Sequence, residues 1–171
     1  MPPIRKERPQ DGPEIESLLD RAFGADRHAR PSYRLREGIE PVYSLCLVAE
    51  AEGRILGTIR HWPVRIGTTG SALLLGPIAV DPPQEGRGIG GLLTRTALDM
   101  AAAEGHRVVV AVGALGYLGR FGFTSAARHG ISLPGLNDPR RLLALGLAPG
   151  ALDGVEGAVA RVSPEATSCR P

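Results

Sequence analysis

The spacing of apolar residues along the chain predicts two main helices set among short strands. Residues 11–14 (D-G-P-E) combine an aspartate, a proline and a second acid, which is typical of a helix start, and Gly24 is the expected end. A longer helix is predicted from Gly88 to Glu104, because apolar residues recur there every three or four positions. They form one stripe, which consists of Ile89, Leu92, Leu93, Ala97, Met100 and Ala101.

Strand patterns account for most of the remaining apolar residues. The predicted strands, in chain order, are residues 4–8, 45–50, 55–66, 72–80, 107–112 and 155–162, with another after Gly122. The turns at residues 51–54 and 67–70 are short, so the strands on either side of each are expected to pair antiparallel. Residues 107–112 follow a strand and a helix, which favours parallel pairing with residues 72–80.

The predicted strand at residues 72–80 has an interrupted middle. It is apolar on both faces, which predicts a central position in the sheet. Gly76 and Pro77 lie at its centre, and proline cannot donate a hydrogen bond to a neighbouring strand. We therefore expect a kink or a bulge at this dipeptide.

The order of the predicted elements indicates a fold class. An antiparallel meander precedes a strand–helix–strand unit, and small helical segments are expected within residues 25–41, 117–121 and 140–145. This order predicts an α+β, or mixed α/β, domain with one central sheet. The length of 171 residues fits one domain and no internal repeat is present, so residues 1–171 are expected to form a single unit.

Charge and composition exclude several classes of function. The net charge is +2 without a long run of one sign, and aromatic residues make up 4%, so no nucleic-acid partner is expected. No apolar run reaches membrane-spanning length and the first residues lack the apolar segment of a secretory signal, so no membrane association is expected. Cys46 is expected in the core and Cys169 lies near the chain end, which indicates neither a disulfide nor a metal site and favours the cytoplasm.

The stretch from Val80 to Leu93 (V-D-P-P-Q-E-G-R-G-I-G-G-L-L) places four glycines just before or inside the first turn of the long helix. Glycine lets the backbone turn sharply and approach a ligand closely. The first N–H groups of a helix lack intrahelical partners, and the helix dipole adds positive potential there. The stretch is therefore predicted to bind a phosphate or a pyrophosphate.

Two common phosphate motifs fit this loop poorly. The ATP-binding P-loop requires a lysine after its last glycine, and the loop has none. Gly86, Gly88 and Gly91 match the dinucleotide fingerprint G-x-G-x-x-G. That fingerprint belongs in the first strand–helix turn of a domain, with an acid about 20 residues beyond it. Here a long antiparallel pattern precedes the loop, and no acid follows the next strand.

Three blocks of sequence resemble the GNAT superfamily of N-acetyltransferases, in detail its YhbS-like bacterial branch. They are G-T-I-R-H-W-P-V (57–64), L-G-P-I-A-V-D-P-P-Q-E-G-R-G-I-G-G-L-L (75–93) and V-G-A-L-G-Y-L-G-R-F-G-F (112–123). The second block resembles the family's acyl-CoA signature. The resemblance implies a GNAT-like, mostly antiparallel sheet with a splayed, bulged strand, flanked by helices. It also implies transfer of an acetyl or other acyl group from acetyl-CoA, or another acyl-CoA, to a primary amine by direct attack, without a metal.

The resemblance also assigns cofactor-binding residues. The pantetheine arm is expected beside the backbone of Ile78, Ala79 and Val80, where one N–H group would polarise the thioester carbonyl. The pyrophosphate is expected at the loop and helix start, namely at Gly86, Arg87, Gly88, Ile89, Gly90 and Gly91. Glu85 stands where the family usually has glutamine or arginine.

Tyr117 is the candidate catalytic residue. In the family, the tyrosine that protonates the departing thiolate lies four residues before the glycine of the G-F pair, and that position is Leu118 in this chain. Tyr117, one residue earlier, is the candidate for the same role, with a packing role as the alternative. The candidates for a general base are His28, His61, His106 and His129.

A basic segment precedes the first long strand and contains His28, Arg30, Arg34 and Arg36. The resemblance implies that this segment borders the substrate cleft, and a solvated basic face is the alternative. Homodimers are common in the family.

Two functions stay open. The first is an N-acyltransferase whose amine acceptor is a small metabolite, an antibiotic, a peptide N-terminus or a lysine. The second is a non-catalytic acyl-CoA-binding module or sensor, which Glu85 and Leu118 favour because they depart from the family pattern.

Overall fold

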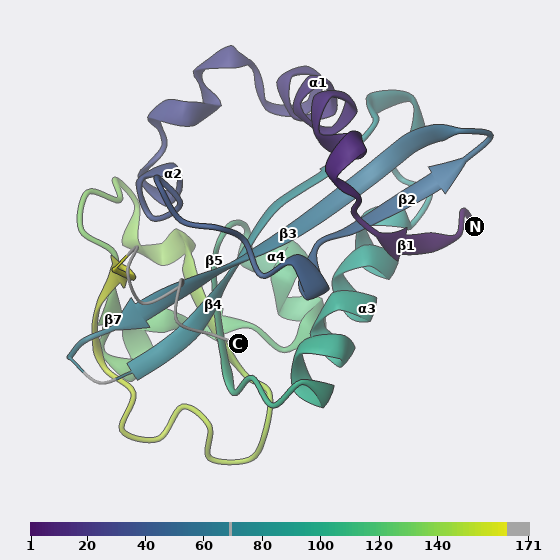
Figure 1. Ribbon diagram of the computed structural model, residues 1–171. Helices are drawn as coiled ribbons and strands as arrows, with labels where there is room; N and C mark the ends of the chain where they lie inside the picture. Colours follow the sequence, from purple (N-terminus) through teal and green to yellow (C-terminus); the bar gives the residue numbers. More distant parts are fainter. Residues whose placement is uncertain (69, 164–171) are drawn as a thin grey trace.

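The structure is a computed structural model that describes residues 1–68 and 70–163. Within these ranges, nine strands form one sheet (Figure 1). Seven of them follow the order β1-β2-β3-β4-β5-β8-β6, while β9 pairs with the end of β3 and β7 pairs with β9. The strands are β1 (Ile4–Lys6), β2 (Leu47–Ala51), β3 (Arg54–Ile66), β4 (Gly70–Val80), β5 (Val108–Val112), β6 (Thr124–Ser125), β7 (Ile131–Ser132), β8 (Leu142–Gly146) and β9 (Gly157–Arg161). The α-helices are α1 (Gly12–Phe23), α2 (Pro31–Arg34), α3 (Ile89–Ala103) and α4 (Leu115–Leu118). The 3₁₀ turns are Pro9–Asp11, Ala25–Ala29, Tyr43–Leu45, Pro82–Gln84, Gly119–Phe121, Ala126–His129 and Pro139–Arg141.

Strand pairing follows the expected directions. β1, β2, β3 and β4 pair antiparallel in sequence order, and β5 runs parallel to β4. α3 supplies the crossover that a parallel connection needs. β8 and β6 continue the sheet antiparallel. The predicted α+β class with one central, mostly antiparallel sheet is therefore confirmed.

Helices α1 and α3 cover opposite faces of the sheet. In β2, Leu47 and Ala49 belong to the core cluster that includes α3, whereas Val48 belongs to the cluster that includes α1. Successive side chains of a strand point to opposite faces, so β2 contributes to both clusters. The sheet is consequently apolar on both sides along its centre, as the pattern of residues 72–80 predicted.

The interruption in β4 is a bulge. Ile59 of β3 faces Ile78, but His61 faces Leu75, so Gly76 and Pro77 together lie opposite the single residue between Ile59 and His61. A bulge bends its strand and disturbs the ladder locally. The prediction from the Gly-Pro dipeptide is confirmed.

The predicted helical turn at residues 140–145 is wrong. Only a 3₁₀ turn, Pro139–Arg141, is present, and β8 follows it and pairs with β5 over its whole length. Periodicity does not distinguish a short buried strand from a short helix in a run such as L-L-A-L. Here the free edge of β5 supplies hydrogen-bond partners, and tertiary pairing decides the conformation.

α1 begins where the sequence predicts, but Asp11 does not cap it. The Asp11 carboxylate accepts a hydrogen bond from the Arg8 backbone N–H at 2.6 Å and forms an ion pair with Arg5 at 2.7 Å. Gly24 ends the helix with a φ of 86°, a conformation that glycine adopts without steric cost.

The cysteine expected in the core is buried. Cys46 is a free thiol with no exposed surface, and burial raises its pKa to about 11. A thiol in this environment is unreactive at neutral pH, so Cys46 has a packing role. Cys169 and Thr69 of the predicted 67–70 turn lie outside the described residues. Across the described ranges, no helix is long and apolar enough to cross a membrane.

Candidate active site

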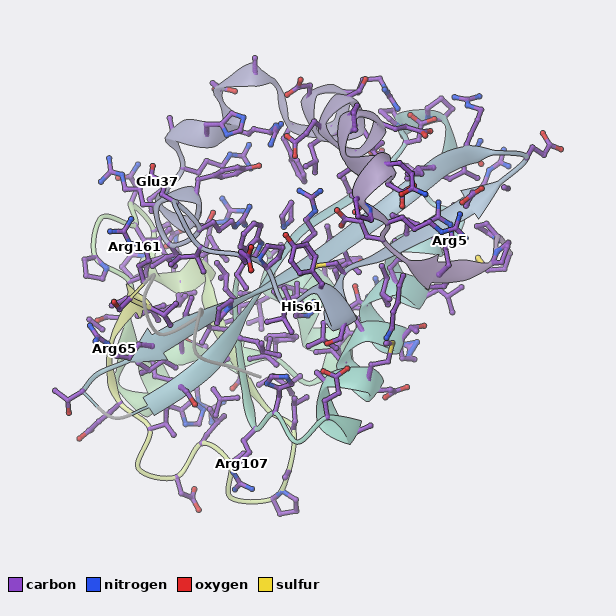
Figure 2. The ribbon with its side chains drawn as sticks, viewed as in Figure 1. Arg5, Glu37, His61, Arg65, Arg107 and Arg161 are labelled. Atoms are coloured by element: carbon purple, nitrogen blue, oxygen red, sulfur yellow. The ribbon has the colours of Figure 1, made fainter. Side chains whose placement is uncertain are left out.

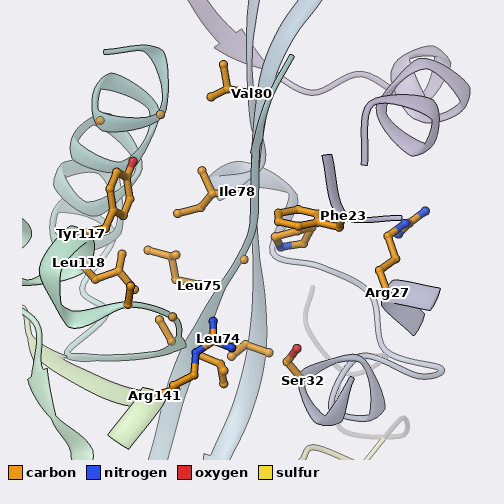
Figure 3. Close-up of a pocket in the computed structure, with 18 of the residues that line it drawn as sticks. Phe23, Arg27, Ser32, Leu74, Leu75, Ile78, Val80, Tyr117, Leu118 and Arg141 are labelled. Carbon is orange, nitrogen blue, oxygen red and sulfur yellow. The ribbon is translucent and has the colours of Figure 1, made fainter. Parts of the chain in front are cut away.

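A cleft of about 600 Å³ follows the second half of β4 and reaches the start of α3 (Figure 3). Its walls come mainly from the second half of β4, the glycine loop, residues 111–120 at the end of β5 and in α4, and the segment from Phe23 to Arg36, with Arg141 from the turn before β8. These parts are distant in the sequence. The sheet topology therefore creates the cleft.

β4 separates from β5 inside this cleft. The two strands pair only over Leu73–Leu75 of β4, and the bulge at Gly76 follows directly. From Gly76 to Val80, β4 is paired with β3 alone, so its other edge faces the cleft. Open backbone groups on such an edge can hydrogen-bond an extended ligand as an added strand would. The Trp62 Nε1–H donates to the Gly76 carbonyl at 2.9 Å and holds the bulge in place.

The glycine loop has the backbone conformation that glycine favours. Gly86 and Gly88 have φ angles of 76° and 83°, and Gly88 is the N-cap residue of α3. Residues 88–91 all line the cleft, so the first turn of α3 presents its unpartnered N–H groups there. Arg21 donates two hydrogen bonds, of 3.1 and 3.2 Å, to the buried Asp81 carboxylate, which anchors the start of the loop.

Most of the predicted cofactor-binding residues meet at this cleft. Its lining includes Ile78, Val80, Gly86, Gly88, Ile89, Gly90, Gly91 and Tyr117. Ala79 lies between two lining residues on the same strand, so its side chain points to the other face and packs in the α1 cluster. Arg87 lines a separate hollow next to Met1 and Leu56.

Tyr117 and Leu118 lie at different positions along the cleft. Figure 3 shows the Tyr117 ring level with Ile78 and Leu118 level with Leu75. The Tyr117 ring packs edge-to-face on Phe121 at 5.7 Å, and the Arg120 guanidinium lies 4.6 Å from its centroid. Leu118 is 4% exposed. The apolar Leu118 therefore lies nearer the bulge, and the Tyr117 hydroxyl lies nearer the start of α3.

The opposite wall comes from the end of α1 and the segment after it. Figure 3 shows Phe23, Arg27 and Ser32 across β4 from Tyr117 and Leu118. No motif in the sequence marks Phe23 or Ser32 as part of a site. Each is adjacent to the cleft only because α1 and α2 fold over the bulge.

The basic segment divides between the cleft and the solvent. Arg30 and Arg36 line the cleft, as the family resemblance implied. His28 lines a smaller hollow next to it, and Arg34 is exposed. Arg161, at the end of β9, donates to the Glu37 carbonyl at 3.1 Å and ties this segment to the sheet (Figure 2).

None of the four histidines, all within the described ranges, lines the cleft. His61 lies inside the fold with no exposed surface (Figure 2). Its Nδ1 is 3.0 Å from the Leu45 carbonyl, which can only accept, so Nδ1 carries the proton and donates. Burial lowers the pKa of His61 to about 4, so the ring is neutral at physiological pH. His61 is therefore a structural residue.

The described residues around this cleft do not form a cluster of metal ligands. Among the described residues, no three or more His, Cys, Asp or Glu side chains are grouped so as to hold a metal ion. The donors that line the cleft are backbone N–H groups, several arginines, and the side chains of Ser32, Tyr33, Gln84 and Tyr117. These donors suit an anionic ligand.

A bulged strand that splays from its parallel neighbour, beside a glycine-rich helix start, is the arrangement of an acetyltransferase of the GNAT fold. Comparisons with known proteins agree. The model of the acetyltransferase (GNAT) domain family matches residues 3–126. The uncharacterized N-acetyltransferase YhbS of Escherichia coli K12 is 34% identical over 158 residues, which cover 91% of this chain and 93% of YhbS.

Two solved structures are similar over almost the whole chain. The crystal structure of Escherichia coli YhbS in complex with CoA has a TM-score of 0.82 at 32% identity and covers 96% of this chain and 92% of that one. A GNAT acetyltransferase from Brucella melitensis in complex with acetyl-CoA has a TM-score of 0.73 at 32% identity, with 96% and 98% covered. The chain belongs to the GNAT acetyltransferase family.

Proposed function

We propose that this protein transfers an acetyl group from acetyl-CoA to a primary amine of a small or peptide acceptor. The observation that carries the proposal is the continuity of the cleft, which joins the glycine loop, the open edge of β4 and the basic wall formed across the bulge by Arg27, Arg30 and Arg36. A donor and an acceptor bound at its two ends would meet beside Gly76. The CoA and acetyl-CoA complexes of the two similar structures support this choice of donor.

The residues of the cleft fit CoA. Its pyrophosphate would accept hydrogen bonds from the N–H groups of residues 86–91, where the α3 dipole also favours negative charge. The pantetheine arm would lie along the open edge at Ile78–Val80, and a backbone N–H there would donate to the thioester carbonyl. The Glu85 carboxylate is exposed, so it can point to solvent away from the pyrophosphate.

The chemistry needs few side chains. A neutral amine attacks the thioester carbon, a C–N bond forms, the C–S bond breaks, and the amine nitrogen gives up a proton. The departing thiolate takes a proton, and Tyr117 is the side chain that we propose as its source. No histidine of the described chain lines the cleft, and we propose that the amine arrives deprotonated or loses its proton to water.

The proposal includes a single GNAT domain over residues 1–171 and a reducing, cytoplasmic compartment. The reduced, buried Cys46 supports the compartment. The homodimer stays a prediction.

Release of free thiol from acetyl-CoA tests the proposal when it is measured over a broad panel of primary amines. Amine-dependent release above the uncatalysed rate supports transfer. Thermal stabilisation by acetyl-CoA without release on any amine favours the non-catalytic binding module, which the replacement of the family tyrosine by Leu118 also favours. Neither release nor stabilisation, with folded protein, rejects both functions.

A further inference from the structure

The arginines in and beside the basic wall of the cleft differ in whether a carboxylate neutralises them. Arg27 is 3% exposed and pairs with Glu16 at 2.6 Å and with Asp20 at 3.0 Å. Arg60, close by on β3, pairs with Glu7 at 2.7 Å and with Glu16 at 3.2 Å. Within residues 1–68 and 70–163, Arg36 forms no ion pair, and its buried Nε has no hydrogen-bond partner. Arg30 also forms no ion pair but is exposed, so Arg36 is the partly buried cation of this wall that lacks a counter-ion in the described chain.

Arg36 is held in place by aromatic rings. Its guanidinium lies 4.5 Å from the Tyr33 ring centroid and 5.7 Å from that of Trp62. Such stacking orients a guanidinium but leaves its N–H edges free for an anion. Burial is the main cause that lowers the pKa of Arg36 to about 10, Tyr33 opposes it and the nearby Arg60 and Arg27 add to it, so the group stays charged at neutral pH.

The guanidinium lies at the reaction centre that the proposed function defines. Arg36 Nη2 is 3.5 Å from the point where a Cβ on Gly76 would stand. Gly76 begins the open edge of β4, where the thioester of a bound acetyl-CoA is expected. The same Gly76 carbonyl accepts the hydrogen bond from Trp62, so the ring, the guanidinium and the bulge form one unit.

The charge of the surrounding lining is also positive. Arg30 and Arg141 line the cleft and are exposed. Among the described residues that line it, Glu85 is the one acid, and it lies in the glycine loop at the pyrophosphate end. A cationic acceptor such as a lysine side chain or a polyamine would meet only repulsion at the bulge.

We propose that the acceptor is a small amine that also carries an anionic group, a carboxylate or a phosphate, and that Arg36 binds this group beside Gly76. The inference rests on the proposed acetyl transfer. A partly buried guanidinium without a counter-ion is costly, and a planar carboxylate or phosphate matches its paired N–H donors. Because Arg36 lies at the bulge itself, the amine and the anion of the acceptor must be only a few bonds apart.

This arrangement also helps to explain attack without a histidine base. Arg30 and Arg141, which the anion of the acceptor leaves unpaired, add positive charge to the lining and disfavour the ammonium form of a bound amine. The anion would therefore hold the acceptor while the arginines lower the pKa of its amine. The second effect favours the neutral nucleophile that direct attack requires.

The first test is a matched series of acceptors. It consists of ω-amino acids from glycine to 4-aminobutyrate, the amides of the same acids, and O-phosphoethanolamine beside ethanolamine, each assayed by thiol release from acetyl-CoA. We expect the preferred anionic member to exceed its neutral counterpart in kcat/KM by about 10-fold or more, the effect of a charge-assisted hydrogen bond. The carboxylate and phosphate arms identify the anion. Equal or faster transfer to the neutral members would overturn the inference and leave the acetyl transfer standing.

The second test does not depend on turnover. Trp62 is the one tryptophan of the chain and stacks on Arg36, so its fluorescence reports binding at this site. In titrations with CoA present, the preferred anionic amine should change the emission of wild-type protein, and Arg36→Met should weaken its binding about 10- to 100-fold. Arg34→Met is the matched control, because Arg34 is exposed in the same segment and should bind as wild type does.

The outcomes separate the two proposals. Stabilisation of Arg36→Met by acetyl-CoA shows that this variant is folded. Wild-type affinity of Arg36→Met for the anionic amines, or no emission change with any of them, would reject the anion site. An emission change that depends on Arg36, without thiol release on any amine, would keep the anion site and reject the acetyl transfer.

Discussion

The Tyr117 hydroxyl lies 2.8 Å from the point where a Cβ on Gly90 would stand. Gly90 belongs to the first turn of α3 and Tyr117 to α4, so this close approach fixes the width of the groove between the two helices. Real Cβ contacts are not this short. The absence of a side chain at Gly90 is therefore a condition for the observed position of Tyr117.

Gly90→Ala should weaken acetyl-CoA binding, because the new methyl group displaces the Tyr117 ring in the groove. Alanine favours a helix by about 1 kcal/mol over glycine, so α3 itself should not be destabilised. In a Tyr117→Phe background the cost should largely disappear, since the Tyr117 Cζ is 4.0 Å from the same point. Isothermal titration with acetyl-CoA of the two single variants and the double variant gives the coupling free energy between residues 90 and 117. Additive effects on the binding free energy would contradict the claim that a side chain at position 90 acts by displacing Tyr117.

Tyr117→Phe should lower kcat with near-normal acetyl-CoA affinity if the hydroxyl protonates the thiolate. The expected loss is about 10²- to 10⁴-fold, the usual contribution of a general acid. The hydroxyl lies towards the start of α3 and the more apolar Leu118 lies nearer the bulge, so the acid must reach the sulfur from the groove side. Steady-state kinetics and a binding titration on one preparation separate the two effects. An unchanged kcat would assign Tyr117 to packing.

Gly88→Val should abolish acetyl-CoA binding, because a φ of 83° is unfavourable for valine and its Cβ would crowd the Met1 side chain at 3.3 Å, so the backbone at the start of α3 must shift. Gly38→Val is the matched control, with a φ of 70° and open space around it, away from the cleft lining. Both variants should lose stability by about 1–3 kcal/mol from backbone strain. Only Gly88→Val should lose the thermal shift with acetyl-CoA. Retained binding in that variant would contradict the loop assignment.

His61 should make the stability of the protein fall with acidity. Its pKa is about 4 in the folded protein and about 6.5 when unfolded, so the unfolded chain binds more protons between these values. The stabilisation is complete above pH 6.5 and is lost as the pH falls towards 4, by up to about 3 kcal/mol. His61→Asn, which keeps a donor near Nδ1 but does not titrate, should show a flatter profile. Urea unfolding at several pH values measures the free energy of unfolding of both proteins. The same dependence on pH in wild type and His61→Asn would exclude His61 as the cause.

Local chemistry made much of the fold predictable. The Gly-Pro pair predicts the bulge because proline cannot donate, and the glycines after Val80 predict the anion site because they precede an amphipathic helix. The strand at residues 142–146 was missed, since its conformation depends on the edge of β5 rather than on its own pattern.

The ion pairing of the arginines in the basic wall could not be predicted from the sequence. Arg27 and Arg36 look alike in the sequence, but only folding brings Glu16 and Asp20 to the first and none to the second. The contact of Arg36 with Gly76 joins residues forty positions apart. No local signal marks such a pair, so the family resemblance placed the basic segment at the cleft, but only the structure places Arg36 at the bulge.

Mass spectrometry of the acceptor tests the central claim most directly. The protein is incubated with acetyl-CoA and the panel of amines, and each amine is examined for the gain of one acetyl group alongside the thiol released. An acetylated amine formed in equal amount to free CoA, and lost in Gly88→Val, is the predicted result. Thiol release without any acetylated amine, or neither product from folded protein, would contradict an N-acetyltransferase that uses this cleft.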